Sequence, residues 1–309
     1  MPLTVQLFKS ISMGAQLTNI QGYYEYKERT SVSEVRNQVF LLAQKVMDPL
    51  IESGLPEDLS HILIATTCPD LLSPSLGQMI KEHYIKELSH CLSLDIVQGC
   101  AGGVSTMILA SQLSESYHSS VLVVNADAAR KATSKKSSLH RIFGNGSFAC
   151  LIRNNGSKYK LIHSKSIQYK GLHDVVQVHL GHDSDEKIRK AKQEIFNDPR
   201  KYLGLSLNKG QALRLFGKAE KFYREFVEES QPPEIMILHQ VNPLIMKHLE
   251  ITFQKYGVKF IDMSGKIGNC GAASVGIALD LIKEDIKGKR LMLCSFGTGG
   301  VITAGLWQC

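Results

Sequence analysis

The same order of structural elements occurs twice along this chain, and this repetition constrains the fold more than any single motif does. Short apolar runs typical of buried strands alternate with helical patterns, which indicates an α/β protein. The apolar run at 62–65 matches the one at 235–238, and Phe-Gly-Asn-Gly at 143–146 matches Phe-Gly-Thr-Gly at 296–299. A duplicated unit of strands and helices explains this register.

The repeat divides the chain into two similar halves, which we place at 1–155 and 156–309. The 309 residues, 43% of them hydrophobic, are enough to form a large core. If the halves pack about a pseudo-twofold axis, equivalent elements face each other. The ends of their strands then border one central pocket, where α/β proteins usually carry their sites.

Cys100 lies where a strand-like run, 93–97, passes into a Gly-rich helix start. Unpaired N–H groups and the positive end of the helix dipole favour a thiolate at such a position, and the thiolate is the nucleophilic form of cysteine. A small buried residue at a tight turn is the alternative interpretation, because free cysteines are often buried.

The duplication indicates two partners for Cys100. Gly99 matches Gly268 in the repeat, so Asn269 occupies the corresponding helix start, and His239 ends a strand of the second half. The three side chains can therefore converge in the central pocket. Taken singly, His239 could be a buried core histidine and Asn269 a helix cap.

Five motifs in this order resemble those of the thiolase superfamily, specifically its 3-oxoacyl-acyl carrier protein synthase III (ketoacyl synthase III) branch. They are Asp-Ile-Val-Gln-Gly-Cys-Ala-Gly-Gly at 95–103, Phe-Gly-Asn-Gly at 143–146, His-Gln-Val-Asn at 239–242, Gly-Asn-Cys-Gly-Ala-Ala-Ser at 268–274 and Ser-Phe-Gly-Thr-Gly at 295–299. The resemblance covers the chain from about residue 29 onward. It implies a thiolase-like α/β fold, in which two duplicated halves of mixed sheet and helices pack in five layers, α-β-α-β-α.

The resemblance also implies a condensing activity and its residues. Cys100 would accept an acyl group from coenzyme A or a carrier protein, because a thiolate exchanges readily with a thioester. His239 and Asn269 would stabilise the enolate formed when a malonyl or β-ketoacyl thioester reacts. The backbone N–H groups of Cys100 and Gly299 would form an oxyanion hole, and Asn242 would help to hold the His239 loop. Coenzyme A or phosphopantetheine thioesters are then substrates, and no cofactor is expected.

Differences within the family favour decarboxylative chemistry. Degradative thiolases carry a second cysteine before the last glycine loop, where this chain has Ser295; Cys294 would point to the other face of the strand. The family's adenine-stacking tryptophan is missing, since the only tryptophan is Trp307. These departures suggest a relative from secondary metabolism.

The net charge of +7 is compatible with phosphorylated ligands or acidic partners. Much of it lies in the basic loop 130–141, where we expect Lys135, Lys136 and Arg141 to contact the phosphates of coenzyme A or a carrier protein. A solvated loop is the alternative. The basic residues do not alternate with aromatic ones as in nucleic-acid-binding proteins, and the irregular His-rich stretch at 173–183 does not suggest a metal site.

The seven cysteines include no Cys-x-x-Cys pair, which predicts free thiols in a reducing, cytoplasmic setting. Neither a secretion signal nor a run of membrane-spanning length is expected. The resemblance implies a homodimer that pairs through the first-half sheet, or a heteromer with a homologous subunit. Two alternatives stay open: an acyltransferase that passes the acyl group to an O, N or C nucleophile without decarboxylation, and a non-catalytic partner of an active homologue.

Overall fold

The central strands among those that the apolar runs predict are buried on both faces. The computed structural model describes residues 16–25, 38–133, 138–153, 159–180 and 203–309. Within β4 (Ser120–Ala128) every residue is buried, and β2 (Leu59–Ala65) pairs parallel to it. Such Val-, Leu- and Ile-rich runs form central strands because helices cover both faces of the sheet.

The first half contains the strands β1 (Gln16–Glu25), β2, β3 (Leu92–Ile96), β4 and β5 (Asn145–Arg153), and the helices α1 (Gln38–Glu52), α2 (Leu76–His83), α3 (Ile85–Leu88) and α4 (Gly102–Tyr117). The second half contains β6 (Lys160–Gln168), β7 (Val176–Leu180), β8 (Leu203–Leu207), α7 (Lys209–Glu229), β9 (Ile235–Leu238), α8 (Pro243–Gln254), β10 (Lys259–Ile261), α9 (Ser264–Ile267), α10 (Ser274–Ile282), β11 (Arg290–Gly297) and β12 (Val301–Gln308).

The strand order repeats the duplication. From edge to centre, the first half runs β3-β2-β4-β5-β1 and the second runs β10-β9-β11-β12-β6. In both halves the first three strands are parallel and the remaining pairings are antiparallel. The halves meet edge to edge through one pair, Gln16 with Lys160, which makes a continuous sheet of ten strands. The expected boundary at 155/156 lies outside the described residues, between β5 and β6.

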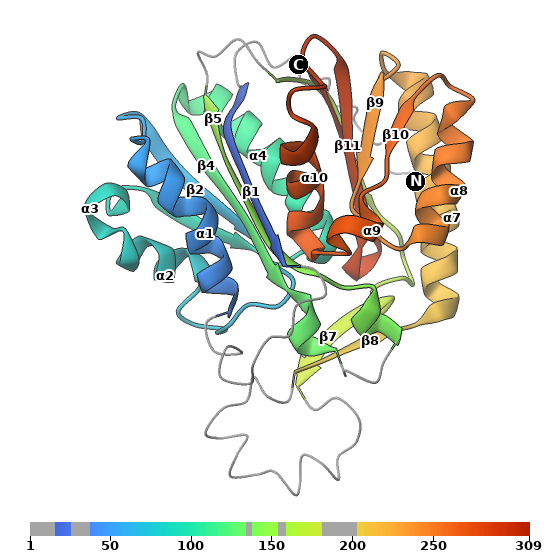
Figure 1. Ribbon diagram of the computed structural model, residues 1–309, viewed down its shortest axis with the longest axis horizontal. Coiled ribbons are helices and arrows are strands. Elements are labelled where there is room, and N and C mark those ends of the chain that lie inside the picture. Colours follow the sequence, from blue (N-terminus) through green and yellow to red (C-terminus); the bar gives the residue numbers. More distant parts are fainter. Residues whose placement is uncertain (1–15, 26–37, 134–137, 154–158, 181–202) are drawn as a thin grey trace, which may run out of the picture.

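The helices form three layers around these strands (Figure 1). In the middle, α4 and α10 pack between the two half-sheets and build a core shared by both halves. On the outside, α1 and α2 cover the first half-sheet, while α7 and α8 cover the second. The structure thus has the predicted α-β-α-β-α arrangement, and the site lies where the central layer meets the strand ends.

The two central helices begin in the same way. A one-turn 3-10 helix, Gly99–Ala101, leads into α4, and another, Gly271–Ala273, leads into α10. Gly99 and Gly271 share a positive φ, +57° and +55°. The expected match of Gly99 with Gly268 is therefore wrong: the 3-10 turn before α10 begins at Gly271, three residues later, so Gly271 is the counterpart of Gly99.

Among the described residues, no helix is both long enough and apolar enough to span a membrane. Each of the seven cysteines is a free thiol. Trp307 is fully buried in the central core, so its ring cannot stack on a ligand at the surface.

Candidate active site

A cavity of about 140 Å³ lies at the strand ends between the two halves, and Cys100, His239 and Asn269 all line it. The remaining lining is largely apolar and comes from the 139–143 segment, β7, β8, α7 and the start of α8. These residues include Leu139, Phe143, Val176, Leu205, Leu207, Leu215 and Ile245. The three polar residues from the two halves therefore share one largely apolar cavity.

Cys100 is the middle residue of the 3-10 turn that precedes α4, and its side chain is half-buried. Its Sγ lies 3.8 Å from Oδ1 of Asn269. Gly297 covers the thiol so closely that a Cβ there would lie 3.3 Å from Cβ and 3.8 Å from Sγ of Cys100. A side chain at position 297 would therefore close the approach to the sulfur.

Cys100 is a thiol in the resting site. Burial raises its pKa to about 12, and the negative charge of Asp127 adds to this effect. Hydrogen bonding with the Asn269 side chain and with the backbone acts in the opposite direction but is weaker. This raised pKa disagrees with the expectation of a thiolate at the helix start, because desolvation outweighs the stabilisation that the helix start provides.

His239 directly follows β9 and is buried. Burial lowers its pKa to about 3, so the ring is neutral at physiological pH. The backbone N–H of Phe296 donates to Nδ1 of His239 at 3.4 Å. A neutral imidazole that accepts at Nδ1 carries its proton on Nε2, so His239 offers an N–H donor.

Asn269 offers a second donor by the same logic. Its Oδ1 accepts from the backbone N–H of Gly271 at 2.9 Å and from Oγ of Ser274 at 3.4 Å. The main chain of Asn269 is fixed by a bridge to Phe143. Since the carbonyl end of the amide is held by these donors, Nδ2 is the end left to donate to a ligand.

Asn242 is the N-cap of α8, where its Oδ1 accepts from the backbone N–H of Ile245 at 3.0 Å. Gln240 braces the same loop: its Oε1 accepts from the backbone N–H of Met263 and its Nε2 donates to the carbonyl of Leu238, both at 2.6 Å. Asn242 also lines the cavity. Both side chains therefore fix the segment that carries His239.

The end of β11 and the turn after it supply Gly297 and Thr298 to the cavity lining, whereas Gly299 is absent from it. Thr298 packs on Gly99, where a Cβ would lie 2.3 Å from its Oγ1. The carbonyl of Gly299 accepts from Gln168 at 2.9 Å. The predicted oxyanion-hole residue thus lies one position beyond the part of the loop that borders the cavity.

Ser295 and Cys294 face opposite sides of β11. Cys294 packs in the outer core with α7 and α8, and its Sγ lies 3.5 Å from the carbonyl of Ile237. Ser295 faces the centre and donates from Oγ to the carbonyl of Cys100 at 2.7 Å. Among the described residues that line the cavity, Cys100 is the only thiol.

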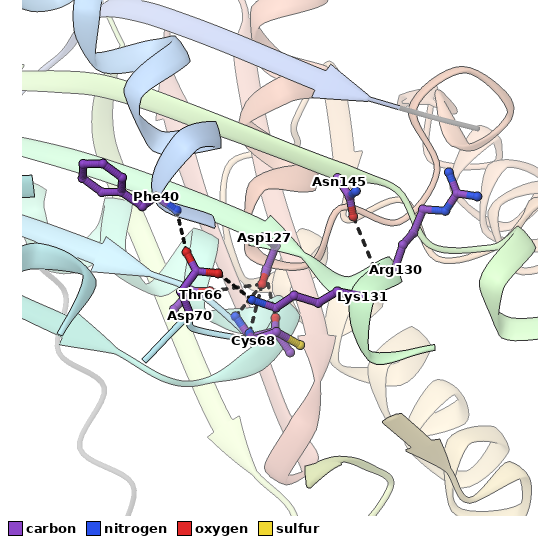
Figure 2. Close-up of polar contacts among 9 residues, drawn as sticks. Phe40, Thr66, Cys68, Asp70, Asp127, Arg130, Lys131 and Asn145 are labelled. Atoms are coloured by element: carbon purple, nitrogen blue, oxygen red, sulfur yellow. Dashed lines mark hydrogen bonds and ion pairs between the residues drawn. The ribbon is translucent and has the colours of Figure 1, made fainter. Parts of the chain in front are cut away.

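The basic loop is only partly described. Lys135 and Lys136 lie outside the described residues, and Arg141 is an exposed residue with interactions of its own. Lys131 of the same loop is not at the surface: it forms a fully buried ion pair with Asp70 at 2.8 Å (Figure 2). Within the described ranges, no group of three or more His, Cys, Asp or Glu side chains could hold a metal ion.

Sequence reasoning missed Asp127, which is buried beside Thr66 and Cys68 (Figure 2). An acidic residue at the end of an otherwise apolar strand is the one signal that could have identified it, because a buried carboxylate requires several donors. Its partners lie about 60 and 145 residues away in the chain, so no local motif reveals them.

Two family models match the chain. One, described as 3-oxoacyl-(acyl-carrier-protein) synthase III, covers residues 94–170, and the other, described as its C-terminal part, covers 230–309. Together they span just over half of the chain. The beta-ketoacyl-(acyl-carrier-protein) synthase III of Staphylococcus aureus strain JH1 is 27% identical, over 90% of this chain and 85% of that protein.

Solved structures share the fold. The 3-oxoacyl-(acyl-carrier-protein) synthase III of Aquifex aeolicus VF5 superposes with a TM-score of 0.72 at 20% identity, covering 96% of this chain and 98% of that one. A priming beta-ketosynthase from a polyketide biosynthetic pathway gives a TM-score of 0.72 at 18% identity, covering 96% of both chains. The family models, the sequence relatives and the fold agree, and the chain belongs to the ketoacyl synthase III family of acyl-transferring condensing enzymes.

Proposed function

We propose that this protein transfers an acyl group from a thioester to Cys100 and then condenses it with a malonyl or β-ketoacyl thioester. One observation carries the proposal: a single thiol and two neutral N–H donors, from His239 and Asn269, border the same apolar cavity. This set can hold an acyl group and stabilise a negatively charged oxygen next to it.

In the first step the sulfur of Cys100 attacks the carbonyl of the acyl thioester. The new C–S bond forms as the old one breaks, and the departing thiol of coenzyme A or the carrier takes up the proton that Cys100 loses. Because the resting group is a thiol, the proton leaves as the substrate binds. The N–H of Cys100 holds the tetrahedral oxyanion, and the loop residues Gly297 and Thr298 are better placed than Gly299 to supply the second donor.

In the second step, for a malonyl thioester, the bond to the carboxylate breaks and CO₂ leaves. The electron pair becomes an enolate whose oxygen accepts from Nε2 of His239 and Nδ2 of Asn269. Two neutral donors suit this task, since they stabilise the charge without protonating the carbon. The enolate carbon then attacks the acyl carbonyl on Cys100, the C–C bond forms, and the Cys100 sulfur leaves and regains a proton.

The largely apolar lining of the cavity fits an aliphatic or aromatic acyl group. The buried position of Trp307 and the absence of another tryptophan favour a donor that is not held by adenine stacking, such as a carrier protein. With the likeness to a polyketide priming ketosynthase, these features support a role in secondary metabolism. The contacts of Lys135, Lys136 and Arg141 with the phosphates of the donor belong to this proposal.

We further propose a cytoplasmic homodimer that pairs through β3. This strand is an edge of the sheet, and Leu92, Leu94 and the adjoining Val97 are exposed on it. Exposed apolar edge strands are templates for pairing with another chain. Leu94→Lys should convert a dimer to a monomer in size-exclusion chromatography with light scattering; an unchanged mass would contradict this interface. The free state of all seven cysteines supports a reducing compartment.

The proposal is tested by separating the two half-reactions. After incubation with a set of acyl-coenzyme A thioesters and acyl carrier proteins, intact-mass spectrometry should show one acyl adduct that Cys100→Ala abolishes. His239→Ala should still form the adduct but lose release of ¹⁴CO₂ from malonyl thioester labelled in its free carboxyl group. If His239→Ala still condenses at the normal rate, the enolate role is wrong. An adduct that passes to an amine or alcohol without CO₂ release would identify a plain acyltransferase.

A further inference from the structure

Asp127 is a fully buried carboxylate, and each partner that the described residues provide for it is a neutral donor. Oδ1 accepts from the backbone N–H groups of Thr67 at 2.6 Å and Cys68 at 3.2 Å, and from Oγ1 of Thr66 at 3.2 Å. Oδ2 accepts from Oγ1 of Thr67 and from the backbone N–H of Ala272, both at 2.7 Å. Five donors compensate the burial of one charge.

These bonds join the two halves at the site. Thr66, Thr67 and Cys68 follow β2 of the first half, whereas Ala272 belongs to the turn before α10 in the second. The preceding residue of that turn, Gly271, donates its N–H to Oδ1 of Asn269. The position of the Asn269 amide therefore depends on the turn that Asp127 holds.

There is little room for this turn to move. A Cβ on Gly271 would lie 2.1 Å from Oδ2 of Asp127, and a Cβ on Gly103 of α4 would lie 1.9 Å from the carbonyl oxygen of Ala272. The turn is thus held between Asp127 and helix α4, which begins two residues after Cys100.

The charge of Asp127 reaches the nucleophile as well. Asn269, the neutral ring of His239 and Gly271 line the same cavity as Cys100, and a Cβ on Gly271 would lie 2.1 Å from Oδ2 of Asp127, so the carboxylate lies directly behind this part of the lining. The charge of Asp127 contributes to the raised pKa of the Cys100 thiol, and the buried thiol of Cys68 also interacts electrostatically with Cys100. Of these described groups Asp127 alone carries a charge, and a negative charge close to a thiol disfavours the thiolate.

We propose that Asp127 is a positioning residue that acts on both half-reactions: it fixes the turn carrying Asn269, and its negative charge behind the cavity lining lowers the reactivity of the Cys100 thiol. This inference rests on the proposed function for the role of Asn269. The effect on Cys100 requires no substrate and is tested without one.

The first test is alkylation of Cys100 by iodoacetamide between pH 7 and 9, followed by peptide mass spectrometry. Asp127→Asn removes the charge, and the alkylation rate at each pH should rise about tenfold. Asp127→Glu keeps the charge and should react at nearly the wild-type rate. Asp70→Asn is the control, because it removes another buried carboxylate of the first half, one that does not contribute to the pKa of Cys100. An unchanged rate in Asp127→Asn, or an equal increase in Asp70→Asn, would overturn the charge effect.

The second test compares acylation of Cys100 with decarboxylation of malonyl thioester. In Asp127→Asn the side-chain N–H₂ points at one or more of the N–H and O–H groups that donate to the carboxylate in the wild type. Because two donors cannot form a hydrogen bond with each other, the turn that carries Asn269 shifts. Decarboxylation should fall about 10- to 100-fold, whereas acylation should not fall, because loss of the charge makes Cys100 more reactive. Equal losses in both half-reactions would overturn the positioning role.

If Asp127→Asn does not fold, Thr67→Val tests the positioning role of Asp127 instead. This nearly isosteric change removes one hydroxyl donor to Asp127 and leaves the charge in place. Decarboxylation should fall relative to acylation while the alkylation rate of Cys100 stays as in the wild type. An unchanged ratio of the two half-reactions would contradict the proposal. If Cys100 takes up no acyl group in any variant, the proposed function fails, and the alkylation result still decides the charge effect.

Discussion

Ser295 donates a hydrogen bond of 2.7 Å from its Oγ to the carbonyl oxygen of Cys100, from a strand of one half to the helix start of the other. Asp127 makes the converse contact, from a strand of the first half to Ala272 in the second. Each half of the chain thus holds the turn that begins the central helix of the other half. The nucleophile and the donors keep their relative positions because these contacts run in both directions.

Ser295→Ala should lower the rate of Cys100 acylation several-fold and the free energy of unfolding by about 1–2 kcal/mol, since it removes a donor to a buried carbonyl. Ser111→Ala is a matched control: its Oγ also donates to a buried carbonyl, that of Met107, at 2.9 Å. The control should lose similar stability in urea unfolding but retain acylation. If both variants acylate equally fast, Ser295 has only a structural role.

The rate at which iodoacetamide alkylates Cys100 should rise about tenfold per pH unit from pH 7 to 10, without a plateau. The pKa of about 12 leaves Cys100 protonated throughout this range, so the small thiolate fraction grows with pH. Peptide mass spectrometry at each pH gives the rate. A plateau below pH 9 would show that the helix start does stabilise the thiolate.

His239 should make the protein less stable in acid. Its pKa is about 3 in the folded protein, against an ordinary value of 6.5, so the unfolded chain binds the proton first. The stability that the neutral ring provides is present above pH 6.5 and is lost as the pH falls towards 3, by about 1.4 kcal/mol per pH unit. His239→Asn should show a shallower decline in urea unfolding between pH 6 and 4. Parallel curves for the two proteins would contradict the assignment.

Gly271→Ala should cost about 2 kcal/mol or more of unfolding free energy, because φ is +55° and the new Cβ would meet Asp127 at 2.1 Å. Gly265→Ala in α9 is the control, since a Cβ at that position would have nothing within 4 Å of it. It should be neutral or stabilising. Thermal unfolding compares the two; equal stability would mean that the Asp127 clamp is not tight.

Lys131→Met should destabilise the protein by about 3–5 kcal/mol, because it leaves Asp70 charged and buried without its cation. Among the described residues, Asp70 would keep the backbone N–H of Phe40, at 2.8 Å. The double variant Lys131→Met with Asp70→Leu should recover most of the loss, as both charges are then removed. Failure of the second change to restore stability would show that the pair is needed for packing rather than charge balance.

Most of the architecture could be predicted because its strands are apolar runs and its half-sheets repeat. The helical pattern at 209–229 coincides with α7, and the run at 120–126 lies within β4. The first strand, β1, could not be predicted in this way, since its polar and aromatic residues lack the apolar run of a central strand. It acquires its place by pairing with β5 and by closing the two half-sheets at Gln16.

Cys100, His239 and Asn269 could be predicted as neighbours because the motif order identifies them and because the duplication brings the two Gly-rich helix starts together, although its register at Asn269 was wrong. The ionisation of Cys100 could not, since it depends on burial and on Asp127, a residue 27 positions away. The position of Lys131 could not be predicted either. In the sequence it belongs to a basic loop, whereas in the structure it is buried in an ion pair with Asp70.

The equivalence of the two 3-10 turns has an evolutionary consequence. The position of Cys100 in the first turn is occupied by Ala272 in the second. A pair of identical, unfused halves would have to carry the same residue in both turns. Joining two copies in one chain releases them from this symmetry, so one copy can keep the nucleophile while the other specialises in holding negative charge on oxygen.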